Sequence, residues 1–207
     1  VRTAREAVRR RLPIVMRGGA SALLGDAVVS KLDSVAGVDT QLRSRPVTVL
    51  HAPSEVSGRF TYYFDENAYE WNLMAPPPVN RRLTLEWDDD LVGKLLRPTD
   101  GTYYMQLALA TRTGGFSSAL GSDGRSALPM RSSAPPALME AMQSAVRSSP
   151  MAELTEVLGP WQSSMLYVGP SGTLAPCHWD ALDNIFCQLD GQKEVLLFAA
   201  DAPGMRP

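Results

Sequence analysis

The sequence predicts a β-rich α+β fold in which strands form the centre and helices pack outside them. Three observations predict this class. Runs of β-branched and aromatic residues indicate strands, and several longer stretches carry apolar residues at helical spacing. Two apolar runs, residues 185–189 and 193–198, are joined through Asp190-Gly191, a pair typical of a two-residue β-hairpin. The length of 207 residues suits one domain, so we expect a single domain over residues 1–207.

The expected elements follow in chain order. Helices are predicted over residues 3–11, 20–35, 84–96 and 137–146, and strands over residues 47–50 and 60–64. Thr84 is the expected N-cap of the third helix, with the acidic residues 88–90 in its first turn, where the helix dipole favours them. Residues 111–136 are rich in Gly, Ser, Ala and Pro, which predicts a long surface loop or insertion.

Charge and cysteine content exclude several classes. The chain has 20 Lys+Arg against 22 Asp+Glu, so no overall basic field indicates a nucleic-acid partner. Its 2 cysteines make no disulfide framework, which favours a reducing compartment. No apolar run reaches the roughly 18 residues that a membrane span needs, so no membrane partner is expected. Cytoplasm or nucleus is the expected location, and the sequence indicates no oligomeric state.

The residues around the hairpin place polar groups on one side. A two-residue loop at Asp190-Gly191 pairs Gln188 with Lys193 and Phe186 with Val195, because cross-strand partners share a face. Asn184 therefore points the same way as Lys193. A buried lysine is costly unless it meets an anion, so this side is expected to receive a small carboxylate.

His178 and Asp180 are the candidate metal ligands. Residues at i and i+2 of a strand project from the same face, so one imidazole and one carboxylate can bind one cation there. This is two thirds of the 2-His-1-carboxylate site of non-haem Fe(II) oxygenases. The other histidine, His51, lies far upstream and is expected on the surface or in the core, so the third ligand is absent from this chain.

These motifs together resemble the JmjC-type, cupin-like Fe(II)/2-oxoglutarate-dependent oxygenases, close in pattern to the asparaginyl-hydroxylase branch. The specific part of the match runs from residue 166 to residue 198 and contains His178-Trp179-Asp180, Asn184 and Lys193. Upstream, Thr102-Tyr103-Tyr104-Met105-Gln106 is similar to the family's Tyr-Tyr-Leu-Gln strand. Residues 13–18 are similar to the N-terminal strand of the family domain.

The resemblance implies a double-stranded β-helix, or jelly roll, with flanking helices. Residues 1–100 would hold the N-terminal strand, helices and flanking strands, and residues 101–207 the first half of the jelly-roll core. The family's second iron-binding histidine lies on a later strand, so we expect a C-terminally truncated fragment that is itself inactive. Ala175 stands where close relatives have a threonine that binds 2-oxoglutarate.

The resemblance also implies the roles of single residues. His178 and Asp180 would be catalytic iron ligands, and Lys193 would bind the far carboxylate of 2-oxoglutarate. Asn184 and Tyr104 would help to hold this cosubstrate, although an error in register would exchange Tyr104 for Tyr103. Gln106 is expected on the substrate side.

The implied function of the intact protein is that of an enzyme, an Fe(II)/2-oxoglutarate-dependent dioxygenase that hydroxylates a side chain of a protein or peptide substrate. Two alternatives stay open. The same chemistry would serve an N-methyl-lysine (histone) demethylase. A non-catalytic cupin-like binding module would need no second histidine. The outer loops that would choose the substrate carry no readable signature.

Overall fold

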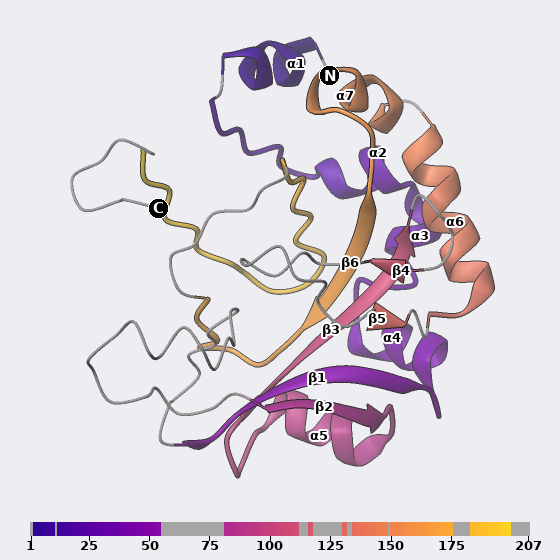
Figure 1. The fold of residues 1–207 in the computed structure, drawn as a ribbon, viewed down its shortest axis with the longest axis vertical. Coiled ribbons are helices and arrows are strands. Elements are labelled where there is room, and N and C mark those ends of the chain that lie inside the picture. The colour runs from indigo at the N-terminus through magenta and orange to yellow at the C-terminus, as the bar shows by residue number, and fades with distance from the viewer. Residues whose placement is uncertain are drawn as a thin grey trace.

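A four-stranded antiparallel sheet is the centre of the structure, a computed structural model (Figure 1). The structure describes residues 2–10, 12–54, 81–111, 116–117, 130–131, 134–148, 150–175 and 183–199. In the sheet the strand order is β2-β1-β3-β6, so β1 and β2, which follow one another in sequence, lie together at one edge. The strands are β1 (Pro46–Ala52), β2 (Arg81–Glu86), β3 (Thr102–Thr111) and β6 (Ser163–Val168).

The predicted strands at residues 47–50 and 102–106 are confirmed as parts of β1 and β3. The predicted strand at residues 60–64 lies outside the described residues. Within the predicted insertion, β4 (Phe116–Ser117) and β5 (Met130–Arg131) pair with each other. These elements show an α+β fold with an antiparallel sheet.

Helices surround one side of the sheet (Figure 1). They are α1 (Arg2–Arg9), α2 (Gly19–Leu24), α3 (Asp26–Val29), α4 (Val35–Leu42), α5 (Asp89–Leu96), α6 (Pro136–Arg147) and α7 (Met151–Leu158). The expected helices at residues 3–11 and 137–146 correspond to α1 and α6. The expected helix at residues 20–35 is divided into α2 and α3 at Gly25, whose φ of 78° breaks the helical path.

The predicted cap of α5 was wrong. Thr84 lies in β2, and Asp88 caps the helix, accepting a hydrogen bond from the Leu91 backbone N–H at 2.8 Å. Thr84 lies between the apolar residues Leu83 and Leu85, a pattern typical of a strand. Asp88 immediately precedes the first turn of the helix and is therefore the residue that can cap it. Asp89 and Asp90 then occupy that turn, as expected from the helix dipole.

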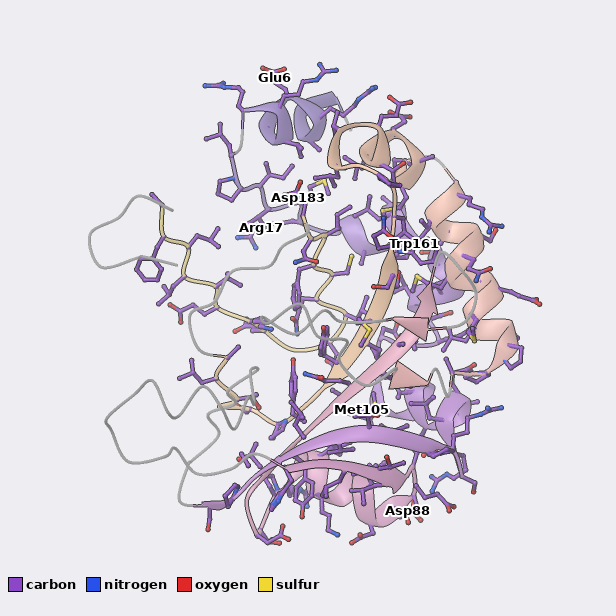
Figure 2. The ribbon with its side chains drawn as sticks, in the orientation of Figure 1. Glu6, Arg17, Asp88, Met105, Trp161 and Asp183 are labelled. Carbon is purple, nitrogen blue, oxygen red and sulfur yellow. The ribbon has the colours of Figure 1, made fainter. Side chains whose placement is uncertain are left out.

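The main core lies between the sheet and the helices. The alternating β3 residues Tyr103, Met105, Leu107 and Leu109 belong to it, together with residues of α3, α4, α5 and α6. Met105 is labelled in Figure 2. Fully burying a large apolar side chain stabilises a fold by about 1.5–3 kcal/mol, so this face anchors the sheet against the helices.

Trp87 locks the loop between β2 and α5 into this core. Its ring is fully buried, and its indole N–H donates to Asp39 Oδ1 at 2.9 Å. Arg43 donates to Asp39 Oδ2 at 2.6 Å and to Asp89 Oδ1 at 2.8 Å. The Arg43 hydrogen bond first, and the Trp87 hydrogen bond second, lower the pKa of Asp39. The network ties α4 to the start of α5.

The opposite side of the sheet, called here the second face, carries the other alternating residues. Leu50, Ala52 and Tyr104 form a small buried cluster on it, separate from the main core. Leu50 is paired with Tyr104, and Gln106 with Tyr167, across neighbouring strands. The second face therefore carries Tyr104 and Gln106, the two site residues that the sequence predicts in β3.

The prediction of a β-hairpin at Asp190-Gly191 was wrong, because the two runs that flank this turn do not pair as strands. Residues 183–199 form no strand, and although Gly191 has a φ of 74°, Asp190 is not among the residues with positive φ. A type I′ turn needs positive φ at both central residues. An isolated two-stranded hairpin is marginal without a third strand or a packed face. Here Leu196 and Leu197 are 72% and 67% exposed, so no packed face supports the second run.

The expected strand at residues 13–18 is also not formed. Ile14, Val15 and Met16 are exposed, so the segment has apolar strand-like composition without a partner among the described residues. Residues 13–18 and 193–198 form no strand for the same reason. A strand needs the backbone groups of a neighbouring strand as hydrogen-bond partners. The jelly roll itself stays a prediction. Separately, none of the helices in the described part of the chain has the length and apolar character to cross a membrane.

Candidate functional site

Two tyrosines and a glutamine lie together on the second face. The ring centroids of Tyr104 and Tyr167 are 5.8 Å apart, with an interplanar angle of 21°, so the two rings stack across β3 and β6. Tyr104 is 8% exposed and Tyr167 40% exposed. Gln106, two residues from Tyr104 on the same strand, is buried at 7% exposure. A buried tyrosine and a buried amide side chain thus lie on one face.

Tyr103 lies on the other side and cannot replace Tyr104. Its hydroxyl donates to Asp100 Oδ2 at 2.8 Å, and its ring belongs to the main core. Burial first, and the bond to Asp100 second, raise the pKa of Tyr103. The register between β1 and β3 therefore assigns Tyr104 to the second face and Tyr103 to the helix side.

His51 shares the helix side with Tyr103. Their ring centroids are 4.5 Å apart, and His51 Nε2 lies 3.2 Å from the backbone oxygen of Asp100. Gly101 closes this contact, since a Cβ there would meet Ala52 O at 2.4 Å and His51 Nε2 at 2.6 Å. His51 is half-buried and packs against Tyr103 on the face opposite Tyr104, as expected for a surface or core histidine.

A tight turn after β6 leads from this face toward the predicted metal ligands. Gly172 has a φ of 81°, and Thr173 Oγ1 donates to the backbone oxygen of Pro170 at 2.7 Å. Gly169 starts the turn and packs directly against the Tyr104 ring. The chain then continues through the partly buried Ala175. His178 and Asp180, the expected iron ligands, lie outside the described residues.

Lys193 and Asn184 are both exposed. The Lys193 ammonium lies 4.5 Å from the centroid of the Phe186 ring, a cation–π distance. Within the part of the chain that the structure describes, no carboxylate forms an ion pair with Lys193. The ammonium is therefore held by an aromatic ring rather than by an acid.

Residues 186–189 alternate between exposed and half-buried, as in a strand, although they are unpaired. Cys187 and Leu189 are half-buried and pack against the core clusters, whereas Phe186 and Gln188 are exposed. Burial raises the pKa of the Cys187 thiol. In Figure 1 the yellow trace of residues 183–199 runs toward the left of the view, away from α6. Lys193 and Phe186 are both exposed, so the buried position that the hairpin pairing implied for Lys193 is not observed.

The structure brings some predicted site residues together and leaves others unplaced. Tyr104 and Gln106 share the second face, and Lys193 lies on the segment that carries Asn184. In the described ranges, no group of three or more His, Cys, Asp and Glu side chains could hold a metal ion. The predicted ligand pair stands between these ranges, in residues 176–182.

Sequence reasoning missed two residues of this site. Tyr167 stacks on Tyr104, and Gly169 supports the same ring. Both stand in the segment Leu166-Tyr167-Val168-Gly169 that precedes the metal motif. The register of β6 against β3, which pairs Tyr167 with Gln106, was the missing information.

The described residues form an α+β fold with an antiparallel sheet, and in the sequence a His-x-Asp motif, His178-Trp179-Asp180, follows β6. The model of the cupin-like domain family matches residues 2–202, and the chain belongs to this family. Comparison with curated proteins and with solved structures gave no match.

Proposed function

We propose that this chain is part of an Fe(II)/2-oxoglutarate-dependent dioxygenase that hydroxylates a protein side chain. The observation that carries the proposal is the placement of Tyr104 and Gln106 together on the second face, next to the turn that leads to His178-Trp179-Asp180. The cupin-like domain family includes Fe(II)/2-oxoglutarate oxygenases and JmjC demethylases, which supports the chemistry.

In this proposal His178 and Asp180 hold the iron. The neutral imidazole and the carboxylate are the ligand types that Fe(II) sites of this class use, and their i, i+2 spacing suits a strand. The other histidine of the 207 residues, His51, lies on the helix side. The third protein ligand would therefore come from outside these residues.

Lys193 would bind the distal carboxylate of 2-oxoglutarate, with Tyr104 and Asn184 as further contacts. The cation–π contact of an exposed lysine is worth about 0.5–1 kcal/mol. A hydrogen bond between charged partners is worth about 1.5–3 kcal/mol. The hydrogen bond to a carboxylate is the stronger of the two interactions, so a bound carboxylate can displace the Lys193 ammonium from the Phe186 ring. The observed contact is therefore compatible with a role of Lys193 in binding an anion.

When bound, iron and 2-oxoglutarate would allow O₂ to oxidise an unactivated C–H bond, with 2-oxoglutarate converted to succinate and CO₂. The side chains of this chain would position the cosubstrate and keep water from the reacting centre. Gln106 would meet the substrate, because it lies on the same face as Tyr104. The proposed substrate is a protein or peptide, and the proposed location is the cytoplasm or nucleus.

A non-catalytic cupin-like binding module is the second candidate, and Ala175 favours it. This partly buried residue provides no side-chain hydroxyl where the resembling oxygenases use a threonine to hold 2-oxoglutarate. Such a module would keep the second face and bind a small ligand or peptide without oxidising it.

Mass spectrometry of peptide mixtures separates these functions. The protein, expressed from its full coding sequence, is incubated with Fe(II), 2-oxoglutarate and O₂. Hydroxylation adds one oxygen atom to a peptide, demethylation removes a methyl group as formaldehyde, and both reactions form succinate. Peptide binding without succinate would support the binding module. The Asp180→Ala protein is the control, and oxidation that persists in it would contradict the proposed iron site.

A further inference from the structure

Gly169 lies so close to the Tyr104 ring that a side chain of any other residue at position 169 would clash with it. A Cβ built on Gly169 would lie 2.5 Å from Tyr104 Cδ2 and 3.1 Å from Tyr104 Cε2. Nonbonded carbon atoms pack at about 3.5–4.0 Å. The Tyr104 ring thus packs against the Cα of Gly169, in the space that a side chain at position 169 would fill.

The ring has little room to move away from that wall. Tyr167 stacks on it, and Leu50 and Ala52 complete the buried cluster around it. Gly169 is not among the glycines with positive φ, so an alanine there faces no left-handed backbone strain. The restriction at residue 169 comes from the Tyr104 ring and not from the backbone.

The turn holds Gly169 in this position. Thr173 Oγ1 donates to the Pro170 backbone oxygen at 2.7 Å, and it would lie 3.5 Å from a Cβ on Gly169. In the sequence this turn stands between β6 and the predicted metal ligands, His178 and Asp180.

We propose that Gly169 is a positioning residue, whose missing side chain sets the Tyr104 ring against Tyr167 and thereby sets the affinity for 2-oxoglutarate. The inference rests on the proposed role of Tyr104 in holding this cosubstrate. An alanine would push the ring by about 1 Å, the difference between the 2.5 Å approach and a normal carbon contact. Such a displacement weakens or breaks a hydrogen bond, because donor and acceptor must stay within a few tenths of an ångström of their normal separation.

The test compares Gly169→Ala with Gly93→Ala. Gly93 lies in α5, a Cβ added there would meet no atom within 4 Å, and its φ is not positive. It is therefore a matched glycine-to-alanine control. Binding of 2-oxoglutarate by these variants, expressed from the full coding sequence, is measured by calorimetry in the presence of Mn(II). The ring is followed separately by fluorine NMR of 3-fluorotyrosine protein, with Tyr104→Phe used to assign its resonance.

We expect Gly169→Ala to shift the Tyr104 resonance and weaken 2-oxoglutarate binding about tenfold or more, the loss of one hydrogen bond to a charged group. Mn(II) affinity should not change, and Gly93→Ala should match the unaltered chain in both readouts. In a Tyr104→Ala background, Gly169→Ala should cause no further loss, because the ring that it displaces is gone.

Unchanged 2-oxoglutarate binding in Gly169→Ala would overturn the inference. An equal loss in the Tyr104→Ala background would also overturn it, since Gly169 would then act through the turn alone. If the unaltered protein, expressed from its full coding sequence, binds Mn(II) but no 2-oxoglutarate, the proposed function fails. The fluorine resonance then still shows whether Gly169 positions the Tyr104 ring.

Discussion

Tyr103 and Tyr104 are neighbours in β3, but their side chains serve opposite sides of the sheet. The Tyr103 hydroxyl donates to Asp100 at 2.8 Å on the helix side, beside His51. Tyr104 stacks on Tyr167 on the second face. The alternation of a strand thus gives two identical side chains different tasks, one in stability and one at the candidate site.

The two tyrosine-to-phenylalanine variants should separate these tasks. Tyr103→Phe loses its hydrogen bond to Asp100, which should lower the free energy of unfolding by about 0.5–1.5 kcal/mol and leave 2-oxoglutarate binding unchanged. Tyr104→Phe keeps the stacked ring and should weaken 2-oxoglutarate binding. Chemical denaturation and calorimetry measure the two effects. Weaker cosubstrate binding in Tyr103→Phe than in Tyr104→Phe would show that the assignment of faces is wrong.

Asp39 should make the stability of the chain depend on acid pH. Its pKa is lowered from 3.8, first by the Arg43 hydrogen bond and then by that of Trp87. A lowered pKa in the folded state gives stability that is fully present above pH 3.8 and is lost as pH falls through the folded value. Asp39→Asn should flatten this part of the profile.

Denaturant unfolding at a series of acid pH values measures the effect. The exposed Asp33, changed to Asn, is the control variant, and it should keep the slope of the unaltered chain. An Asp39→Asn profile as steep as that of the unaltered chain would show that other carboxylates dominate acid unfolding.

If Lys193 binds the cosubstrate and Asp180 binds the metal, substitutions of these two residues should affect activity differently. Lys193→Ala removes a charged hydrogen bond of about 1.5–3 kcal/mol, so excess 2-oxoglutarate should partly restore activity in the intact protein. Asp180→Ala should abolish activity at every 2-oxoglutarate concentration. Succinate formation against cosubstrate concentration distinguishes them. Equal loss without rescue would assign Lys193 to folding.

Local signals predicted the elements that depend on their own residues. The strand-like run in β1, the charged run of α1 before Pro13 and the apolar spacing in α6 lie within short windows, and all three elements form. Strand β3 was expected from its resemblance to the family's Tyr-Tyr-Leu-Gln strand, and it also forms. Residues 193–198 show the limit of such signals. Their composition is that of a strand, but strand pairing depends on a neighbour, and the exposed Leu196 and Leu197 have no packed face.

For the candidate site too, the features that depend on local sequence could be predicted, and those that depend on strand register could not. The parity of Tyr104 and Gln106 follows from strand alternation, so both could be assigned to one face before the sheet was known. The contact between Gly169 and Tyr104 could not be, because it depends on the register of β6 against β3 and on the turn that follows. For His178 and Asp180, outside the described residues, the pairing on one face stays a prediction.

Metal binding by the 207-residue chain tests the central claim, that His178 and Asp180 hold the metal ion. Mn(II) titration followed by electron paramagnetic resonance compares the unaltered chain with His178→Ala, Asp180→Ala and His51→Ala. The account predicts weak binding by the unaltered chain, the same binding in His51→Ala, and loss of it in both other variants. Mn(II) binding that survives His178→Ala and Asp180→Ala, or that disappears in His51→Ala, would contradict it.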